Sequence, residues 1–300
     1  MNTPPSHRRL IALSLLGALV LRAPLGHAAD APPPAPVPVA VAIARPSPAD
    51  VAQAAESLKK FLAQTDAATK ALVAKYPDLV AVRPPRVNPA VVPGLNPAFR
   101  TKHAANVTIA EKGDIDVLFM GDSITDFWRN STGQYAGKAV FDKYYGAMKV
   151  ANFGISGDTT QGVLYRLRDG EGRGFQPKAI MLMIGTNNSG PCSSAEIAEG
   201  AGAVVTEMRQ DFPAAKILLL AIFPRGSPGD ATRKTVADVN PIIAKLHDGK
   251  NVFYLDIGAK FLGPDGTIPQ DIMSDRLHPT EKGYSIWAEA VKEPLAALLK

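Results

Sequence analysis

The last two thirds of the chain alternates short apolar runs with segments of helical character. The apolar runs are Ile115–Met120, Lys149–Phe153, Ala179–Ile184, Lys216–Ile222 and Val252–Asp256, and the helical segments are Tyr135–Tyr145, Thr159–Arg168, Ser193–Gln210, Ala231–Leu246 and Glu281–Leu299. Nearly continuous apolar strands indicate a parallel sheet that helices cover on both faces. Right-handed crossovers between such strands predict an α/β fold, a three-layer α/β/α sandwich around a five-stranded parallel sheet. In such sheets functional residues gather at the carboxyl ends of the strands.

The first 28 residues have the layout of a secretory signal peptide. Arg8 and Arg9 precede a run of 12 residues, Leu10–Leu21, that is apolar except for Ser14. The sequence Gly26-His27-Ala28 then offers small residues at a cleavage site. A retained membrane anchor is the alternative, although the run is shorter than the ~20 residues that a bilayer requires. We therefore expect residues 1–28 to be removed and the product to be exported, periplasmic or extracellular, without stable insertion in the membrane.

A proline-rich leader, residues 29–97, separates the signal from the α/β domain predicted over 98–300. Residues 1–97 contain 16 of the 26 prolines, and residues 31–48 have the composition of an extended tether. Ser47 and Pro48 then predict the start of one amphipathic helix over about 47–76. Packing of this helix on the main domain is the favoured interpretation, and binding of a partner or shaping of a substrate site is the alternative.

Charge and cysteine content exclude several classes of protein. The formal charge is +5, but Arg8, Arg9 and Arg22 leave with the signal, no acidic residue is lost, and the mature charge is +2. The basic balance therefore belongs mostly to the export signal, and we expect no nucleic-acid partner. The single cysteine, Cys192, excludes an intramolecular disulfide and a multi-thiolate metal site.

Polar and glycine-rich motifs follow the first three predicted strands. Gly121-Asp122-Ser123-Ile124 places a serine hydroxyl at the start of a helix, where the helix dipole favours negative charge, although a plain N-cap serine is the alternative. The second strand runs into Asn152–Asp158 (NFGISGD), whose glycines allow an amide N–H to approach an oxyanion or form a simple tight turn. The third strand is followed by Gly185-Thr186-Asn187-Asn188, where an asparagine amide can donate to the same oxyanion or cap a turn.

A histidine near the C-terminus completes this set of residues. His103, His247 and His278 remain after removal of the signal, and the first two are predicted in helical surface positions. Only His278 has an acidic residue, Asp275, one turn earlier, so a single short loop can carry both a general base and its orienting carboxylate.

These four motifs together resemble those of the SGNH hydrolases, also called GDSL-type esterases. The resemblance covers roughly residues 98–300, and it rests on GDSIT (121–125), NFGISGD (152–158), GTNN (185–188) and DRLHP (275–279). Within the superfamily the likeness is to the catalytic subunits of platelet-activating factor acetylhydrolase and their bacterial relatives, through NFGISGDTTQGVLYRL (152–167) and FPRG (223–226).

The resemblance implies a flavodoxin-like fold and a role for each motif residue. Ser123 would be the nucleophile, His278 the base and Asp275 its partner, and the oxyanion hole would comprise Ser123 N–H, Gly157 N–H and the Asn187 side chain. Such a catalytic domain acts by acyl transfer and uses no cofactor and no metal.

The sequence therefore predicts an exported serine ester hydrolase for short-chain, preferentially acetyl, esters. The medium-sized side chains of Ile124, Thr186 and Leu277 flank the motif residues and suggest a small acyl pocket, with simple packing as the alternative. The expected partner is a small-molecule or carbohydrate ester, for which carbohydrate O-deacetylation is one form of the activity. Nothing in the sequence defines an oligomeric state.

Other functions are open at this point. One is a lysophospholipase or thioesterase, although the sequence has no long apolar lid. Another is a metal-dependent phosphoesterase that uses Asp122, Asp275 and His278, although no His-x-His pair or further carboxylate cluster accompanies them. A third is a non-catalytic carbohydrate-binding relative, although binding alone would not need an intact Ser, His and Asp. The hypothesis that Cys192 is an alternative nucleophile has less support than any of these.

Overall fold

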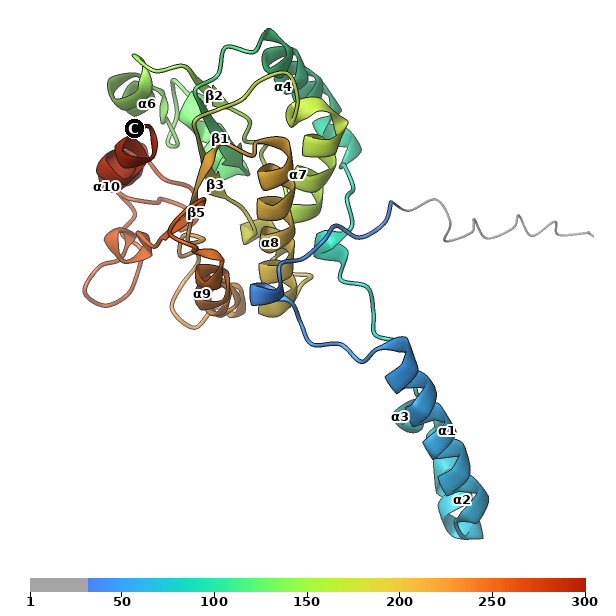
Figure 1. Cartoon of the computed structure of the whole chain (residues 1–300). Helices are drawn as coiled ribbons and strands as arrows, with labels where there is room; N and C mark the ends of the chain where they lie inside the picture. Colours follow the sequence, from blue (N-terminus) through green and yellow to red (C-terminus); the bar gives the residue numbers. More distant parts are fainter. Residues whose placement is uncertain (1–31) are drawn as a thin grey trace, which may run out of the picture. The chain divides into compact units, whose positions relative to one another are not determined.

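The protein is organised around a five-stranded, all-parallel sheet (Figure 1). The computed structural model describes residues 32–300, and the predicted signal peptide lies outside them. The strands are β1 (Val117–Gly121), β2 (Val150–Asn152), β3 (Ala179–Met183), β4 (Lys216–Leu220) and β5 (Val252–Leu255), in the spatial order β2-β1-β3-β4-β5. Four strands lie within the apolar runs of the sequence and β1 extends one residue beyond its run, to Gly121, so the predicted sheet is confirmed.

Helices cover both faces of the sheet and confirm the predicted three-layer sandwich (Figure 1). One face packs against α4 (Arg100–Lys112), α7 (Thr160–Arg166), α8 (Ser194–Asp211) and α9 (Ala231–Ile243), and the other against α6 (Lys138–Tyr145) and α10 (Glu281–Leu298). Along β1, Leu118 and Met120 enter the first core, whereas Val117 and Phe119 enter the second. Because successive side chains are buried on opposite faces of the sheet, successive positions of a strand are apolar, and the strands form continuous apolar runs in the sequence.

An aromatic cluster in the second core fixes the helix that begins at the end of β1. The Trp128 ring lies 4.3 Å from that of Tyr284 and 5.0 Å from that of Trp287, centroid to centroid. The Tyr284 hydroxyl donates to the carbonyl of Ile124 at 2.8 Å. Ile124 belongs to the short helix α5 (Ser123–Asp126), so α10 holds α5 against the sheet.

The N-terminal part of the described chain contains two helices where the sequence predicted one over 47–76. Helix α1 (Pro48–Gln64) begins with the expected capping box at Ser47, α2 (Ala67–Lys75) follows it, and α3 (Pro77–Val80) is a single turn. The single helix is wrong because Asp66 caps a new helix, its side chain accepting from Thr69 N at 2.8 Å. No residue of α1 or α2 is buried.

Short segments on either side of these helices pack on α8. Ala35, Val41, Ala90 and Val91 are buried in the first core. A Cβ at Gly202 of α8 would lie 2.5 Å from a methyl carbon of Val41, so only glycine allows this approach, despite a cost of about 1 kcal/mol in a helix interior.

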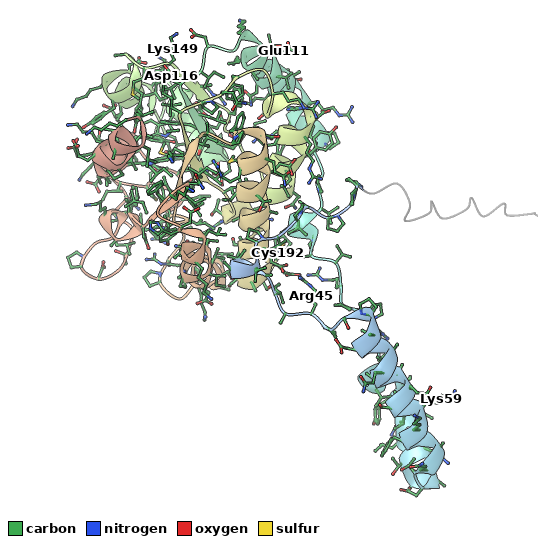
Figure 2. The ribbon with its side chains drawn as sticks, in the orientation of Figure 1. Arg45, Lys59, Glu111, Asp116, Lys149 and Cys192 are labelled. Carbon is green, nitrogen blue, oxygen red and sulfur yellow. The ribbon has the colours of Figure 1, made fainter. Side chains whose placement is uncertain are left out.

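Glu199 of α8 anchors the same segments through hydrogen bonds. Its carboxylate accepts from Ile43 N at 2.7 Å, from both terminal nitrogens of Arg45 at 2.6 Å, and from Asn88 Nδ2 at 2.9 Å (Figure 2 labels Arg45). The leader is thus tied to the α/β domain at both ends of its helical portion. Among residues 32–300, no helix is sufficiently long and apolar to traverse a membrane.

A buried ionic network links α4 to α7. Arg166 is fully buried and contacts both Asp158 and Glu171. Glu171 accepts from His103 Nδ1 at 2.9 Å, and His103 Nε2 lies 3.1 Å from Asp169. The prediction that His103 lies at the surface is wrong. Only 6% of the surface of His103 is exposed, because α4 packs against the segment Leu167–Glu171.

His103 makes the stability of this network depend on pH. The hydrogen bond to Glu171 is the main cause that raises the pKa of His103 above its usual value. A raised pKa means that the stabilisation is complete at pH values below the unfolded pKa of about 6.5 and is lost as pH rises through the folded pKa. We expect His103→Gln to lower the free energy of unfolding most near pH 6 and progressively less above pH 7. Denaturant unfolding across this range measures the difference, and a difference independent of pH would contradict the prediction.

Candidate active site

Ser123 lies where β1 ends and α5 begins. Asp122 is the N-cap of α5, and its carboxylate accepts from Ile124 N at 3.0 Å. Ser123 is therefore the first helical residue, and only 6% of its surface is exposed. The hydroxyl thus stands at the carboxyl edge of the sheet, in the position where an α/β fold presents reactive groups.

The structure brings Ser123, His278 and Asp275 together in one hydrogen-bonded chain. Ser123 Oγ lies 2.8 Å from His278 Nε2, and His278 Nδ1 lies 2.6 Å from Asp275 Oδ2. The second oxygen of Asp275 accepts from the backbone N–H of His278 at 2.8 Å and of Leu277 at 3.0 Å. Within residues 32–300, Arg276 is the only non-glycine residue with positive φ, 58°, and this conformation folds the loop back on Asp275.

Asp275 is held in its ionised form. Partial burial would raise the pKa of its carboxyl, but hydrogen bonds from the His278 backbone, the His278 ring and the Tyr135 side chain together lower it below its usual value. A carboxylate that stays charged fixes the proton on Nδ1 of His278 and leaves Nε2 free to accept a proton from Ser123.

Gly157 and Asn187 lie on the loops that follow β2 and β3. Gly157 is exposed and adopts φ of 85°, a conformation that side chains other than glycine rarely take. Asn187 belongs to the short segment Thr186–Asn188, and its Nδ2 donates to the carbonyl of Asp158 at 2.8 Å. The loop after β2 is joined to the serine turn because Asn152 Nδ2 donates to Thr125 O at 2.8 Å.

The three residues expected to form an acyl pocket differ in accessibility. Ile124 and Thr186 are each 1% exposed, and Leu277 is half-buried. Arg225, which sequence reasoning left without a role, donates to the carbonyl of Thr186 at 2.9 Å and so links the FPRG segment to the GTNN motif. The burial of Ile124 and Thr186 is that of packing residues, and Leu277 is the accessible one of the three.

Aromatic side chains around the site were missed by sequence reasoning. The rings of Phe127 and Tyr135 lie 5.0 Å and 5.1 Å from the His278 ring and are stacked on each other at 5.7 Å. Phe99 lies beside the loop after β2, 3.4 Å from the position of a Cβ at Gly157. No spacing in the sequence signals these contacts, because Phe99 and Tyr135 lie far from His278 along the chain.

A second missed group, Asp126, supports the loop after β2. Its carboxylate accepts from Lys102 Nζ at 2.6 Å, from Arg129 Nη2 at 2.7 Å and from Ser156 Oγ at 2.8 Å. Burial alone would raise the pKa of Asp126, but these hydrogen bonds and the charge of Arg129 lower it below its usual value. Arg129 also donates to the carbonyl of Gly154 at 2.6 Å, so this ion pair holds both sides of the loop.

Asp122 differs from the other carboxyl groups of the site. Burial raises its pKa to about 7, and its Oδ2 has no hydrogen-bond partner. Its Oδ1 caps α5, and Asp275 and His278 are bonded to each other, so the three do not converge as ligands. Across residues 32–300, no cluster of three His, Cys, Asp or Glu side chains is arranged to hold a metal ion. Cys192, labelled in Figure 2, is buried, and the hydrogen bonds of the His278 ring go to Ser123 and Asp275.

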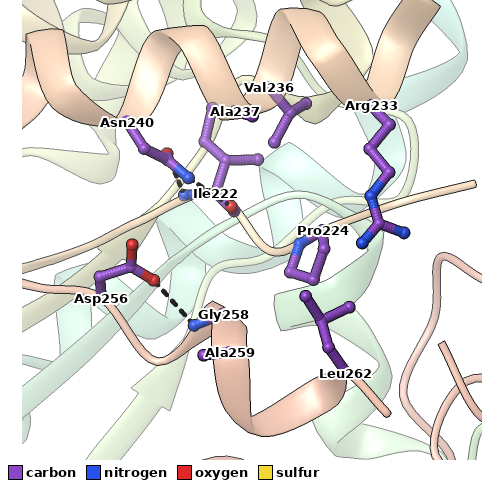
Figure 3. Close-up of a pocket in the computed structure, with 10 residues that line it drawn as sticks. All are labelled: Ile222, Pro224, Arg233, Val236, Ala237, Asn240, Asp256, Gly258, Ala259 and Leu262. Carbon is purple, nitrogen blue, oxygen red and sulfur yellow. Dashed lines mark hydrogen bonds between the residues drawn. The ribbon is translucent and has the colours of Figure 1, made fainter. Parts of the chain in front are cut away.

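A separate cavity of about 220 Å³ lies between α9 and the turn Gly258–Phe261 (Figure 3). Its walls are Ile222, Pro224, Arg233, Val236, Ala237, Asn240, Asp256, Gly258, Ala259 and Leu262. Its polar groups are already engaged within the chain: Asn240 pairs with the backbone of Ile222, and Arg233 donates to the carbonyl of Gly266 at 2.7 Å. None of the residues expected at the active site lines this cavity.

Comparisons with known proteins agree with the motifs. Residues 119–286 match the GDSL-like lipase/acylhydrolase family. Platelet-activating factor acetylhydrolase IB subunit alpha2 of Gallus gallus is 34% identical over 220 residues, covering 71% of this chain and 93% of that protein. The alpha1 subunit of Homo sapiens is 30% identical over 198 residues, covering 66% and 82% respectively.

Solved structures show the same fold. A member of the lipolytic G-D-S-L family from Veillonella parvula aligns with a TM-score of 0.51 at 20% identity, covering 61% of this chain and 98% of its own. A GDSL-like lipase from Bacteroides thetaiotaomicron aligns with a TM-score of 0.50 at 20% identity, covering 67% and 96%. The chain therefore belongs to the GDSL-like lipase/acylhydrolase family of the SGNH hydrolase superfamily, and it is a carboxylic ester hydrolase.

Proposed function

We propose that the protein is an exported serine esterase for short-chain, preferentially acetyl, esters. The observation that carries this proposal is the chain of hydrogen bonds from Ser123 Oγ to His278 Nε2, at 2.8 Å, and from His278 Nδ1 to Asp275, at 2.6 Å. A neutral serine hydroxyl is a weak nucleophile, and an adjacent base that is itself oriented by a carboxylate is what activates it.

The proposed reaction uses this chain of hydrogen bonds. His278 takes the hydroxyl proton as Ser123 attacks the ester carbonyl, and Asp275 stabilises the resulting imidazolium. Negative charge develops on the carbonyl oxygen, where Ser123 N–H, Gly157 N–H and Asn187 Nδ2 stabilise it more than they stabilise the ground state. His278 then protonates the leaving alcohol, and water repeats the sequence on the acyl-enzyme.

One observation favours a short acyl group, and Leu277 is the residue beside the triad that can limit acyl size, because Ile124 and Thr186 are almost completely buried. The relatives that match most of the chain are named acetylhydrolases. The half-buried rings of Phe99 and Tyr135 offer apolar surface to the alcohol portion of the substrate, which is compatible with an O-acetylated carbohydrate.

Export and domain organisation complete the proposal. The charged, apolar and small-residue regions of residues 1–28 support secretion. All proposed catalytic residues lie within 98–300, which we assign as the catalytic domain, and residues 29–97 form a leader whose described ends pack on that domain.

The first prediction separates serine chemistry from metal chemistry. Wild-type protein should hydrolyse p-nitrophenyl acetate in the presence of EDTA, and Ser123→Ala should lower turnover by at least ~10³, because the nucleophile is lost. Cys192→Ala, which removes a buried thiol outside the hydrogen-bonded triad, is the control and should retain activity. Loss of wild-type activity to EDTA would favour a metal-dependent phosphoesterase, and failure of a fluorophosphonate to label Ser123 would favour a non-catalytic binding protein.

The second prediction concerns the oxyanion hole. Asn187→Ala should lower kcat by ~10²–10³ with little change in KM, because its donor is used mainly in the transition state. Asn240→Ala is a matched control, since the Asn240 amide bonds only the backbone of Ile222 and lies outside the triad. Steady-state kinetics on p-nitrophenyl acetate measure both variants, and an unchanged kcat for Asn187→Ala would remove Asn187 from the mechanism.

The third prediction concerns acyl length. On p-nitrophenyl esters, kcat/KM should be highest for acetate and fall as the acyl chain grows. Leu277→Ala should raise the butyrate-to-acetate ratio about tenfold, the usual effect of one or two methylenes in an apolar pocket. A profile that favours long acyl chains would point to a lysophospholipase or thioesterase, and an unchanged ratio would reduce Leu277 to a packing role. Acetylated sugars and xylan then test the alcohol.

A further inference from the structure

The two proposed oxyanion donors outside Ser123 are joined through a single residue, Asp158. Asn187 Nδ2 carries two hydrogens, and one is donated to the carbonyl of Asp158 at 2.8 Å. Gly157, the other donor, immediately precedes Asp158 in the chain. The orientation of the second Asn187 hydrogen and the position of the Gly157 N–H therefore both depend on where Asp158 is held.

Asp158 is held by Arg166. Arg166 Nε donates to Asp158 Oδ2 at 2.9 Å, and Arg166 Nη2 lies 2.8 Å from the same oxygen. Arg166 Nη1 donates to the carbonyl of Phe153 at 3.1 Å. One guanidinium thus contacts both ends of the loop 153–158, a geometry that its planar set of donors allows and that a lysine ammonium does not.

Helix α7 is shaped to receive the Asp158 carboxylate. Gly162 and Arg166 are four residues apart and therefore lie on the same face of the helix. A Cβ at Gly162 would lie 1.8 Å from Asp158 Oδ1, so the carboxylate fits only because residue 162 has no side chain. Arg166 and Asp158 are both completely buried, and neither contacts substrate in the proposed mechanism.

The rest of the network orients Arg166. Glu171 accepts from the guanidinium, and Asn106 Nδ2 donates to Glu171 at 3.2 Å. Burying these charges requires desolvation that a well-packed apolar core would avoid. What the charged pair supplies is a fixed direction for Asp158.

We propose that Arg166 is a positioning residue of the oxyanion hole, acting through Asp158 on Gly157 N–H and Asn187 Nδ2. The inference rests on the proposed esterase function. It predicts that a weakened contact between Arg166 and Asp158 slows the chemical step while substrate binding stays nearly intact.

The test is a conservative substitution with a matched control. Arg166→Lys keeps the charge but cannot contact Asp158, Phe153 and Glu171 together, and kcat on p-nitrophenyl acetate should fall about 10- to 100-fold with KM changed less than about threefold. Arg168→Lys is the control. Arg168 makes an equivalent two-nitrogen contact with Glu207, at 3.0 and 2.8 Å, away from the loop, and its kcat should stay within about twofold.

A double-mutant cycle distinguishes positioning from general support of the fold. In an Asn187→Ala background one of the two positioned donors is already absent, so Arg166→Lys should lower kcat at least about fivefold less than in wild type. A full additional loss in that background, or an unchanged kcat in the single variant, would overturn the inference.

A second variant guards against misfolding. Asp158→Asn keeps the backbone carbonyl and the side-chain shape but removes the charge that Arg166 holds, and it should show the same loss of kcat at nearly constant KM. Thermal unfolding of each variant confirms that kinetics are measured on folded protein. Absent wild-type hydrolysis and absent Ser123 labelling would defeat the proposed function itself, whereas an active wild type with an unaffected Asp158→Asn would defeat only the inference.

Discussion

Parallel pairing of β1 with both β2 and β3 is the constraint on which the proposed active site depends. In this register Phe119 lies opposite Asn152 and Gly121 lies opposite Met183, so the three strands end at one edge of the sheet. The serine turn and the two loops that carry Gly157 and Asn187 therefore start side by side. Main-chain contacts extend the pairing beyond the strands, since Ile155 N donates to Gly121 O at 3.2 Å. His278 arrives from the other side, on the loop before α10, and the hydroxyl of Tyr284 fastens that helix to α5.

Ion pairs hold the loop after β2, which the sheet itself does not fix. The loop after β2 contains two glycines and no regular structure, so its backbone would sample many conformations without further restraint. Two buried carboxylates flank it: Asp126 gathers Lys102, Arg129 and Ser156 on one side, and Asp158 meets Arg166 on the other. A pre-organised set of donors needs this kind of support, because electrostatic stabilisation of a transition state is lost when the donors must first be ordered. The low dielectric of the interior makes the ionic groups costly to bury, but it also strengthens the hydrogen bonds between them.

Periodicity and local spacing predicted the sheet, the helices between its strands and the pairing of Asp275 with His278, because each of these depends on residues close together in the chain. The Ser47 cap was predicted for the same reason, whereas the helix that follows was predicted too long because the capping role of Asp66 was missed. The ionic network could not be predicted from the sequence, because His103 and Glu171 are separated by 68 residues and nothing near either one indicates a partner. The aromatic contacts of Tyr135 with His278 were hidden for that reason as well. Sequence patterns thus predicted the groups proposed to react, and the structure added those that hold them.

The packing of the leader on α8 has a consequence for how the N-terminus can be trimmed. Ala35 is the first buried residue of the described chain, and its N–H donates to the carbonyl of Val91 at 2.7 Å. The proposed cleavage after Ala28 lies six residues before residue 35, so it would leave the hydrogen bond between Ala35 and Val91 in place. Proteolysis beyond Val41 would instead uncover Gly202, a helix position that has no side chain of its own to fill the space. Removal of residues 35–41 would therefore leave part of the first core without cover, so we expect any N-terminal cleavage that preserves the fold to lie before Ala35.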